Sequence, residues 1–441
     1  MSQGWADRVA RLGLEGESAR IATARFAEVE RRFAGRFGDT SEAQAWWVPG
    51  RIEVLGKHTD YGGGRSLLAA VERGFHVLAR PRDDGRIRLL DASSNALLGV
   101  PLAPDIAPRP GHWTDYPLSV FRRMARDFPT AAHGMDAVIR SSIPPASGLS
   151  SSSALVIATF LPLAHFNGLR GTPTWRREFP DDDHLAGYLG AVENGLGFGS
   201  FAADQGVGTH GGSEDHTAIL RSRSNQLAQY HFLPVTAEAS LPLPEGWTFA
   251  VAVSGVHASK AGRVLDHYNA LSAQLSTLLT LWREATGHPA HSLYAALMSD
   301  PTASQRLDVL AADHSAALAA RFEQFRDEVQ VIIPGVVAAL AAGDFDRVGT
   351  LVDRSQQLAE RALRNQVPET VHLARRAREL GAAAASAFGA GFGGSVWALV
   401  RREHAADFSA AWLADYLDSF PTQRARADVF LSAAGPAATM L

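Results

Sequence analysis

The stretch IPPASGLSSSSAL (residues 143–155) joins an apolar strand to an apolar helix through a turn with two prolines and a glycine. The first backbone N–H groups of a helix have no partner within the helix and carry the positive end of its dipole. A helix that begins near Ser150 therefore offers a cradle for an anion, and Gly148 lets the main chain approach it closely. A serine-rich helix cap without a ligand is the alternative, because serine is favoured at helix starts.

A second segment, PGRIEVLGKHTDYGGG (residues 49–64), is unusually dense in polar side chains directly after an apolar strand. It carries Arg51, Lys57, His58 and Asp60 between a proline and a glycine hinge. Solubility does not require so many different polar groups, and their density is typical of side chains that converge on a small polar ligand. A charged surface loop is the alternative.

A third segment, FGAGFGGSVWALV (residues 388–400), contains a formal G-x-G-x-x-G pattern. A dinucleotide-binding loop follows a strand and opens a helix, whereas these glycines precede the predicted strand 396–400. The context therefore excludes a dinucleotide-binding loop. We expect instead that this glycine loop packs its backbone closely against the phosphate-binding turn.

Composition limits the class of protein. The 441 residues are enough for two domains, and 46% hydrophobic residues supply core for both. The absence of cysteine excludes disulfides and thiolate chemistry, and a net charge of −4 gives no electrostatic reason to expect nucleic acid as a partner. No apolar run reaches the length of about 18 residues that a membrane span needs, so we expect a cytoplasmic protein with no membrane partner.

Hydrophobic periodicity and breaker residues predict an α+β fold, because helices and strands do not alternate regularly. No residue pattern decides the oligomeric state, and a monomer is kept as the simplest expectation. The expected helices cover 7–36, 113–127, 150–167, 267–285, 301–341, 344–362 and 368–380, with a further helix that carries Glu193; the expected strands cover 45–55, 66–80, 86–91, 135–141, 227–232, 248–254, 395–401 and 425–431.

The three segments together, in this order, resemble those of the GHMP small-molecule kinases, and within them galactokinase and related sugar-1-kinases. The resemblance implies two lobes with the active site between them: a ribosomal-protein-like N-terminal lobe (residues 1–235) and a ferredoxin-like C-terminal lobe (residues 236–441). It also implies an enzyme that uses ATP and Mg²⁺ to phosphorylate the anomeric hydroxyl of a monosaccharide. Galactose, converted to galactose 1-phosphate, is the first expectation.

The resemblance further implies roles for individual residues. Arg51 would bridge the sugar hydroxyl and the transferred phosphate, and Ser152 with Glu193 would hold Mg²⁺. The sugar would contact Lys57, His58, Asp60, Tyr61 and Tyr268. The nucleotide would contact Trp113 near the adenine, and then Pro145, Gly148, Leu149, Ser150, Ser151, Ser152, Ser153, Gly391 and Gly393.

Two aspartates compete for the role of catalytic base. The resemblance implies an Asp-Gln pair at the start of a helix about a dozen residues after Glu193, and Asp204-Gln205 has that spacing. However, Asp204 is followed by a glycine-rich run that does not favour a helix, whereas His216-Thr-Ala-Ile-Leu220 after Asp215 does. We therefore assign the base to Asp215 and keep Asp204 as the alternative.

Three positions depart from the galactokinase pattern. Lys57 stands where these kinases carry a Glu that reaches the sugar 6-hydroxyl, Glu53 replaces an Asn, and Ser386 replaces an Arg. A lysine attracts a carboxylate that a glutamate would repel, by up to about 4 kcal/mol at ~4 Å in an intermediate dielectric. A uronic acid such as galacturonate is therefore an alternative substrate, unless Lys57 donates to a neutral hydroxyl or points away.

Two other functions remain open at this point. The chain could be a sugar- and ATP-binding sensor that has lost turnover, although Arg51, Glu193 and Asp215 are all present. A kinase of mevalonate or homoserine type is a weaker alternative, because His58-Thr-Asp-Tyr61 has no use on acyclic substrates.

Overall fold

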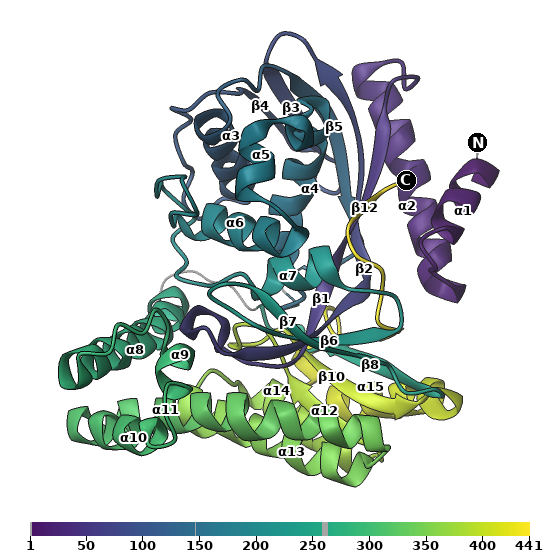
Figure 1. The fold of residues 1–441 in the computed structure, drawn as a ribbon. Coiled ribbons are helices and arrows are strands. Elements are labelled where there is room, and N and C mark those ends of the chain that lie inside the picture. Colours follow the sequence, from purple (N-terminus) through teal and green to yellow (C-terminus); the bar gives the residue numbers. More distant parts are fainter. Residues whose placement is uncertain (1, 146, 258–262) are drawn as a thin grey trace.

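Two β-sheets, each covered by helices, build the molecule in the computed structural model, which describes residues 2–145, 147–257 and 263–441 (Figure 1). The first sheet has the order β12-β1-β2-β5-β3-β4, and β6 and β7 extend it beside β2. Among the described strands of this sheet, β3 and β5 alone pair in parallel. Its strands are β1 (Gln44–Leu55), β2 (Arg65–Arg82), β3 (Arg86–Asp91), β4 (Leu97–Pro101), β5 (Gly134–Ser141), β6 (Gln226–His231), β7 (Thr236–Pro242) and β12 (Thr439–Met440).

Helices cover both faces of the first sheet. On one face lie α1 (Ser2–Ala10) and α2 (Gly16–Phe37), whose Phe26 and Phe33 pack in a buried cluster with Trp47 and Val138 of the sheet. The helix 7–36 expected from the sequence is thus two helices, because Gly13 adopts a left-handed φ of 75° between them. The other face carries α3 (Asp115–Asp127), α4 (Ser151–Phe166), α5 (Pro173–Glu178), α6 (Asp182–Asn194) and α7 (Glu214–Arg221).

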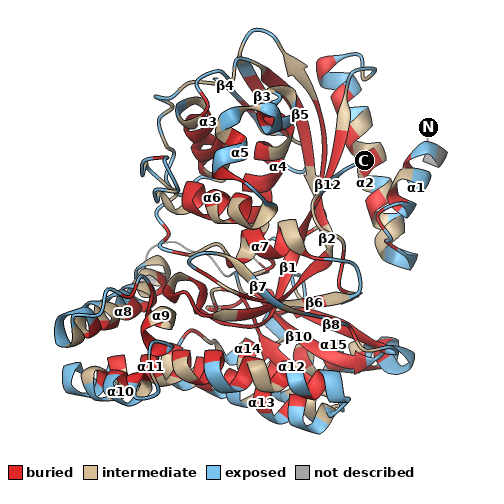
Figure 2. Ribbon diagram, viewed as in Figure 1, coloured by how far each residue is buried: buried red, intermediate tan, exposed pale blue. Residues whose placement is uncertain are grey.

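Helix α4 is buried along almost its whole length, as Figure 2 shows. It packs on β1 and β2 and is flanked by α3, α6 and α7. An all-round apolar sequence such as Ala154–Leu163 suits a helix that is surrounded by protein. This burial fixes the start of α4, and with it the phosphate-binding turn, at the edge of the sheet.

The second sheet has the order β11-β8-β10-β9 and is antiparallel throughout. Side chains alternate between its faces: Ala250 and Ala252 meet the cluster of α14 and α15, while Phe249 and Val251 meet that of α12 and α13. The strands are β8 (Trp247–Val253), β9 (Ala384–Ala387), β10 (Ser395–Arg401) and β11 (Asp428–Ser432); the helices are α12 (Ile333–Ala342), α13 (Phe345–Leu358), α14 (Pro368–Glu379) and α15 (Ala405–Ser419).

A helical extension with its own core precedes α12. It consists of α8 (Arg263–Thr286), α9 (Leu293–Leu297), α10 (Ala303–His314), α11 (Ala316–Asp327) and a π-helical turn, η3 (Glu328–Ile332). The sequence predicted one helix over 301–341. The break lies at Ser315, which is extended at φ −171° and accepts a hydrogen bond from the N–H of Leu318, so that it caps a new helix.

The chain leaves the first sheet later than expected. The boundary predicted at residue 235 falls between β6 and β7, which form one hairpin of the first sheet. The C-terminus then returns to this sheet, where Gly435 bridges Ala70 and β12 pairs with β1. Among the described helices, none has the length and apolar character that crossing a membrane requires.

Candidate active site

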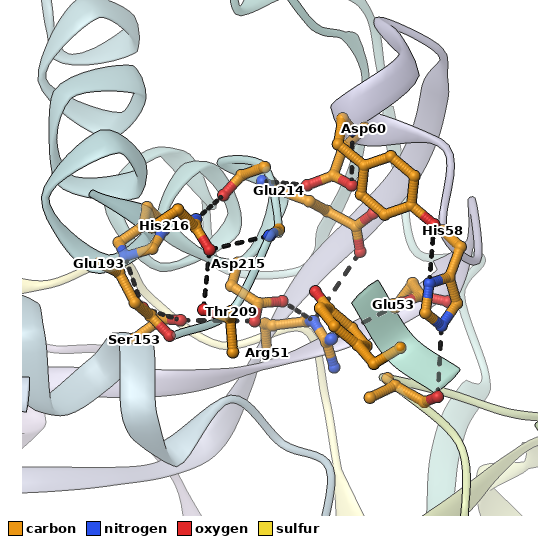
Figure 3. A pocket seen from close by; sticks show the side chains of 17 residues that line it. Arg51, Glu53, His58, Asp60, Ser153, Glu193, Thr209, Glu214, Asp215 and His216 are labelled. Carbon is orange, nitrogen blue, oxygen red and sulfur yellow. Dashed lines mark hydrogen bonds and ion pairs between the residues drawn. The ribbon is translucent and has the colours of Figure 1, made fainter. Parts of the chain in front are cut away.

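Two hollows that share part of their lining lie where α4, α7 and the loop after β1 meet the second half of the chain. Figure 3 shows the inner one. The outer cleft has a volume of about 770 Å³. The inner cavity is strongly polar, and its wall carries one arginine, five carboxyl groups and two histidines. Residues that line the outer cleft include Trp113, Asp115, Tyr116, Ser147, Gly148, Leu149, Ser150, Ser151 and Ser152. Residues that line the inner cavity include Glu53, His58, Asp60, Tyr61, Glu193, Glu214, His216 and Tyr268. Both hollows are lined by Arg51, Thr209, Asp215, Gly389 and Ala390.

The phosphate-binding turn predicted from the sequence opens onto the outer cleft. Helix α4 begins at Ser151 after Ser150, whose φ is 58°, and its first internal hydrogen bond runs from the N–H of Ala154 to the carbonyl of Ser150. The N–H groups before Ala154 therefore have no partner within the helix. The buried hydroxyls of Ser147 and Ser150 also have no hydrogen-bond partner within the part of the chain that the structure describes. Amides and hydroxyls of this kind suit the oxygens of a phosphate chain.

The glycine loop of the third segment packs against this turn, as expected. A Cβ atom at Gly389 would lie 2.9 Å from the carbonyl oxygen of Gly148, and one at Gly394 would lie 3.1 Å from that of Ser147. Gly391 and Gly393, however, pack against Asn365 and Val256. The residues of this loop that line the cleft are Gly389 and Ala390, not the predicted Gly391 and Gly393.

Two other predicted nucleotide contacts also lie outside the lining of the outer cleft. Pro145 is exposed on the turn, and Ser153 belongs to the inner cavity. Trp113 and the remaining residues of the turn line the cleft as predicted. Tyr116 lies beside Ser152, and burial raises the pKa of its hydroxyl above the usual range.

Arg51 lies at the junction of the two hollows and links several elements. Its Nη1 donates to the carbonyl of Gly148 at 2.7 Å, and its Nε donates to Oδ1 of Asp215 at 2.7 Å. Burial by itself lowers the pKa of Arg51, but the carboxylates of Asp215, Glu53 and Glu214 together raise it. The guanidinium is therefore a fixed positive charge between the phosphate-binding turn and the inner cavity.

The structure separates the two candidate bases. Asp215 lies in the first turn of α7, opposite Arg51, and lines both hollows. Asp204 lines neither and is held by Arg122 Nε at 2.9 Å and by Arg126 Nη1 at 2.7 Å. Burial raises the pKa of Asp204, but hydrogen bonds from the Gln205 N–H and Arg122 lower it overall. A carboxylate engaged in this way is poorly placed to take a proton from a substrate.

Oxygen ligands suited to magnesium meet beside Asp215. Oε2 of Glu193 accepts a hydrogen bond from Ser153 at 2.8 Å, and the same hydroxyl lies 3.4 Å from Oδ2 of Asp215. Ser153 is thus the serine that contacts Glu193, whereas Ser152, which was predicted to hold Mg²⁺ with Glu193, lines the outer cleft. None of the described His, Asp and Glu side chains form a group of three that could hold a metal. Glu193 and Ser153 fit Mg²⁺ held jointly with phosphate oxygens, which is its usual mode.

The predicted sugar-binding residues, Lys57 excepted, line the inner cavity together. Nδ1 of His58 is 2.9 Å from the Tyr61 hydroxyl, and the rings of His58 and Tyr268 are 5.2 Å apart. Oδ2 of Asp60 accepts a hydrogen bond from the backbone N–H of Glu214 at 3.2 Å. Glu214 was not among the predicted site residues, and only its place next to Asp215 pointed to it.

Lys57 turns away from the inner cavity and is buried between the lobes. Its Nζ donates to the hydroxyls of Ser386 at 2.8 Å and Ser355 at 3.3 Å. Ser355 in turn donates to Oε1 of Glu328 at 3.0 Å. The prediction that Lys57 contacts the sugar is therefore wrong. The expectation of a uronic acid as substrate depended on that contact and loses its support. The small side chain at Ser386 leaves room for the lysine.

One helix face holds the loop that carries His58 and Asp60. Arg321 donates to the carbonyl of His58, and Gln324 donates to that of Lys57 at 3.0 Å. Glu328 accepts from the N–H of Gly56 at 2.9 Å. Sequence reasoning missed these three buried residues, because their polar periodicity on α11 and η3 resembles an exposed face and their partners lie more than 250 positions away.

Comparison with known proteins matches these features to one family. The galactokinase galactose-binding signature matches residues 31–81, the GHMP kinase N-terminal domain matches residues 115–209, and the GHMP kinase C-terminal domain matches residues 336–418. The chain is a galactokinase-like GHMP kinase. The matched ranges include Arg51, the phosphate-binding turn, Glu193 and the glycine loop.

Individual relatives agree with this family. The galactokinase of Chloroflexus aggregans is 28% identical over 389 residues, which cover 84% of this chain and 87% of the relative. That of Streptococcus mutans is 37% identical over 130 residues, 29% of this chain and 33% of the relative. The crystal structure of Lactococcus lactis galactokinase complexed with galactose has a TM-score of 0.77 at 23% identity and covers 93% of this chain and 98% of that one. Methanococcus jannaschii mevalonate kinase shares the fold, with a TM-score of 0.53 at 14% identity over 90% of this chain and 99% of that one.

In this GHMP kinase, replacing Lys57 with Met is expected to lower the free energy of unfolding by about 3 kcal/mol, because it removes a cation that stabilises the buried carboxylate of Glu328. Chemical denaturation measures this loss. The double variant Lys57→Met, Glu328→Gln should recover part of it, since no charge is then left uncompensated. A change in preference between neutral and acidic sugars, with stability unaltered, would contradict the assigned position of Lys57.

The buried Glu53 predicts a pH-dependent stability of the kinase. Burial raises the pKa of Glu53 to about 7, although Arg51 and Lys57 lower it in part. Because this value lies above the usual 4.5, the stability that Glu53 contributes is present below about pH 4.5 and is lost as the pH rises through about 7. Relative to Glu53→Gln, we expect the wild type to lose on the order of 3 kcal/mol over that range, measured by urea denaturation. A parallel pH dependence of both proteins would contradict the prediction.

Proposed function

We propose that this protein transfers the γ-phosphoryl group of ATP to the anomeric hydroxyl of galactose, giving galactose 1-phosphate and ADP. The observation that carries the proposal is the contact of 2.7 Å between Asp215 and Arg51 at the junction of the two hollows. One hollow is bounded by a phosphate-binding turn, and the other by groups that bind hydroxyls. A base and a fixed cation thus lie where a sugar hydroxyl and a terminal phosphate would meet.

The residues divide the work of phosphoryl transfer. The amides at the start of α4 and the hydroxyls of Ser147 and Ser150 bind phosphate oxygens. Asp215 accepts the proton of the anomeric hydroxyl as its oxygen forms the new bond to phosphorus and the bond to the ADP oxygen breaks. Arg51 stabilises the negative charge on the transferred group. Magnesium, which Glu193 and Ser153 would hold together with the phosphates, supplies further charge neutralisation when it is bound.

Galactose is favoured as the substrate for two reasons. Two relatives that each align over 84% of the chain are galactokinases, and the structural relative from Lactococcus lactis was crystallised with galactose. Asp60 and His58 also line the inner cavity. The carboxylate of Asp60 can accept hydrogen bonds from vicinal sugar hydroxyls, and the imidazole of His58 can accept or donate one. A uronic acid loses its support because Lys57 is engaged by Ser355 and Ser386.

A panel of sugars with a readout of ADP release tests the proposal. Galactose, galacturonate, glucuronate and arabinose are each incubated with ATP and Mg²⁺, and the product is examined by phosphorus NMR. We expect galactose to give the highest kcat/KM and a phosphate on C1. Sugar binding without ADP release would instead support a sensor, and a different preferred sugar would refute galactose.

A further inference from the structure

Lys57 is a buried cation that lines neither hollow and is not among the groups that bind substrate or transfer the phosphoryl group. We propose that Lys57 is a positioning residue for phosphoryl transfer. Through Ser386 it fixes the glycine loop (residues 388–394) relative to the sugar loop (residues 56–61) and the phosphate-binding turn. The inference rests on the proposed function, because it takes the two hollows as the sites of the sugar and the nucleotide.

The side chain of Lys57 connects the sugar loop to the strand that leads into the glycine loop. Lys57 is 1% exposed, and its Nζ donates to the hydroxyl of Ser386 on β9 at 2.8 Å. This hydroxyl donates to Oε1 of Gln356 at 3.0 Å, and the backbone N–H of Ala387 donates to the same oxygen at 3.0 Å. A hydroxyl has one proton to donate, so Lys57 supplies a hydrogen bond that the Ser386 oxygen accepts. Because β9 ends at Ala387, this network fixes the point from which the glycine loop starts.

The first two residues of the glycine loop contact the parts of the site that face the phosphates. The centre of the Phe388 ring lies 6.0 Å from Cζ of Arg51, which is within reach of a cation–π contact. Gly389 packs against the phosphate-binding turn, where an added Cβ would lie 2.9 Å from the carbonyl oxygen of Gly148. A shift of β9 would therefore be transmitted to the guanidinium and to the turn together.

The third residue of the glycine loop contacts the sugar loop. The carbonyl oxygen of Ala390 is 3.2 Å from Nε2 of His58. The backbone of the sugar loop is held from the other side by α11, since Gln324 donates to the carbonyl of Lys57 at 3.0 Å. Lys57 thus has its main chain fixed by α11 and its side chain fixed by β9, and it sets the separation of the two loops.

This separation matters because Gly389 and Ala390 line both hollows. The sugar hydroxyl and the terminal phosphate meet between the two loops, beside Arg51 and Asp215. A misplacement of about 1 Å in a reacting geometry costs about 10²-fold in rate, even when its cause lies far from the chemistry. A residue that fixes the glycine loop therefore controls the rate of transfer without touching either substrate.

The family pattern does not supply this contact. Lys57 and Ser386 stand where galactokinases carry a Glu and an Arg. A glutamate at position 57 could not donate to Ser386, and an arginine at position 386 would bring a second cation against Lys57. The lysine and the small serine therefore form a contact that belongs to this chain.

A double-mutant cycle tests the inference. The kcat and the KM values for galactose and ATP are measured for the wild type, Ser386→Ala, Lys57→Met and the double variant, at a temperature at which each is folded by circular dichroism. Ser386→Ala removes one hydroxyl and leaves the contacts of Lys57 with Ser355 and of Ser355 with Glu328 in place, so it tests the inference even if Lys57→Met does not fold.

Thr248→Val is the matched control, because it also removes one buried hydroxyl from the second sheet. Thr248 donates to the carbonyl of Ser432 at 3.2 Å. It pairs with Val400, at the end of β10 away from the glycine loop, which joins β10 at Ser395. A loss of stability without displacement of the glycine loop should therefore appear in this variant.

We expect Ser386→Ala to lower kcat about five- to tenfold and Lys57→Met to lower it about 10²-fold, with the KM for galactose within about twofold of the wild type. If Lys57 acts through Ser386, the double variant has the kcat of Lys57→Met within about twofold, because the contact is already lost. Thr248→Val should keep the wild-type kcat. A wild-type kcat in folded Ser386→Ala, or the same loss from Ser386→Ala in both backgrounds, would overturn the inference.

Failure of the proposed function gives a different result. If no sugar supports ADP release, the kinase assignment fails, and hydrogen exchange of the backbone N–H groups of residues 388–394 decides the inference instead. Faster exchange in Ser386→Ala than in Thr248→Val supports a loop held by the Lys57–Ser386 contact. Equal exchange in the two variants overturns it.

Discussion

Replacing Asp215 with Asn is expected to lower kcat by about 10²- to 10⁴-fold, the range usual for loss of a general base. Asn keeps the size of the side chain and can still contact Arg51, but it cannot accept the proton of the attacking hydroxyl. The KM for galactose should change little, because His58 and Asp60 still line the cavity. Steady-state kinetics of galactose-dependent ADP release measure both constants.

The matched control is Asp204→Asn, the same change at the competing aspartate. Asp204 pairs with Arg122 and Arg126 and lines neither hollow. Its replacement should lower stability, because two arginines lose their charged partner, while kcat stays within about threefold of the wild type. A large loss of kcat in Asp204→Asn, together with an active Asp215→Asn, would reverse the assignment of the base.

Replacing Arg51 with Lys is expected to lower kcat by about 10²- to 10³-fold, comparable to the loss of one preorganised donor to a developing charge. The guanidinium contacts Asp215 and the carbonyl of Gly148 through different nitrogens. A lysine keeps the positive charge but has a single nitrogen, so it cannot hold both contacts and also face the phosphate. Single-turnover kinetics at saturating ATP and galactose isolate this effect.

Thermal and chemical denaturation separate the roles of Arg51 in chemistry and in folding. Arg51→Lys should retain most of the stability, because a cation still faces the buried carboxylates of Glu53 and Glu214. Arg51→Met should lose about 3 to 5 kcal/mol, since it leaves these charges uncompensated. An Arg51→Lys variant with wild-type kcat would refute a direct role for the guanidinium in transfer.

Local sequence signals located the parts of the site that depend on backbone conformation. The two prolines, Gly148 and the serines placed the start of α4 within one residue of Ser151. The helix-forming residues after Asp215 predicted α7, which places Asp215 opposite Arg51. Turn chemistry and helix capping act over a few residues, and they are therefore readable from the sequence by itself.

Only the tertiary structure decided where the long side chains point and which groups they meet. Lys57 follows Gly56 in a polar run that suggested a sugar contact. Its Nζ instead donates a hydrogen bond to the hydroxyl of Ser386, which lies 329 positions away in the chain. Glu328 holds the same loop from 272 positions away. The direction of a flexible side chain depends on the partners that folding brings to it, and no local pattern encodes a partner so distant in the chain.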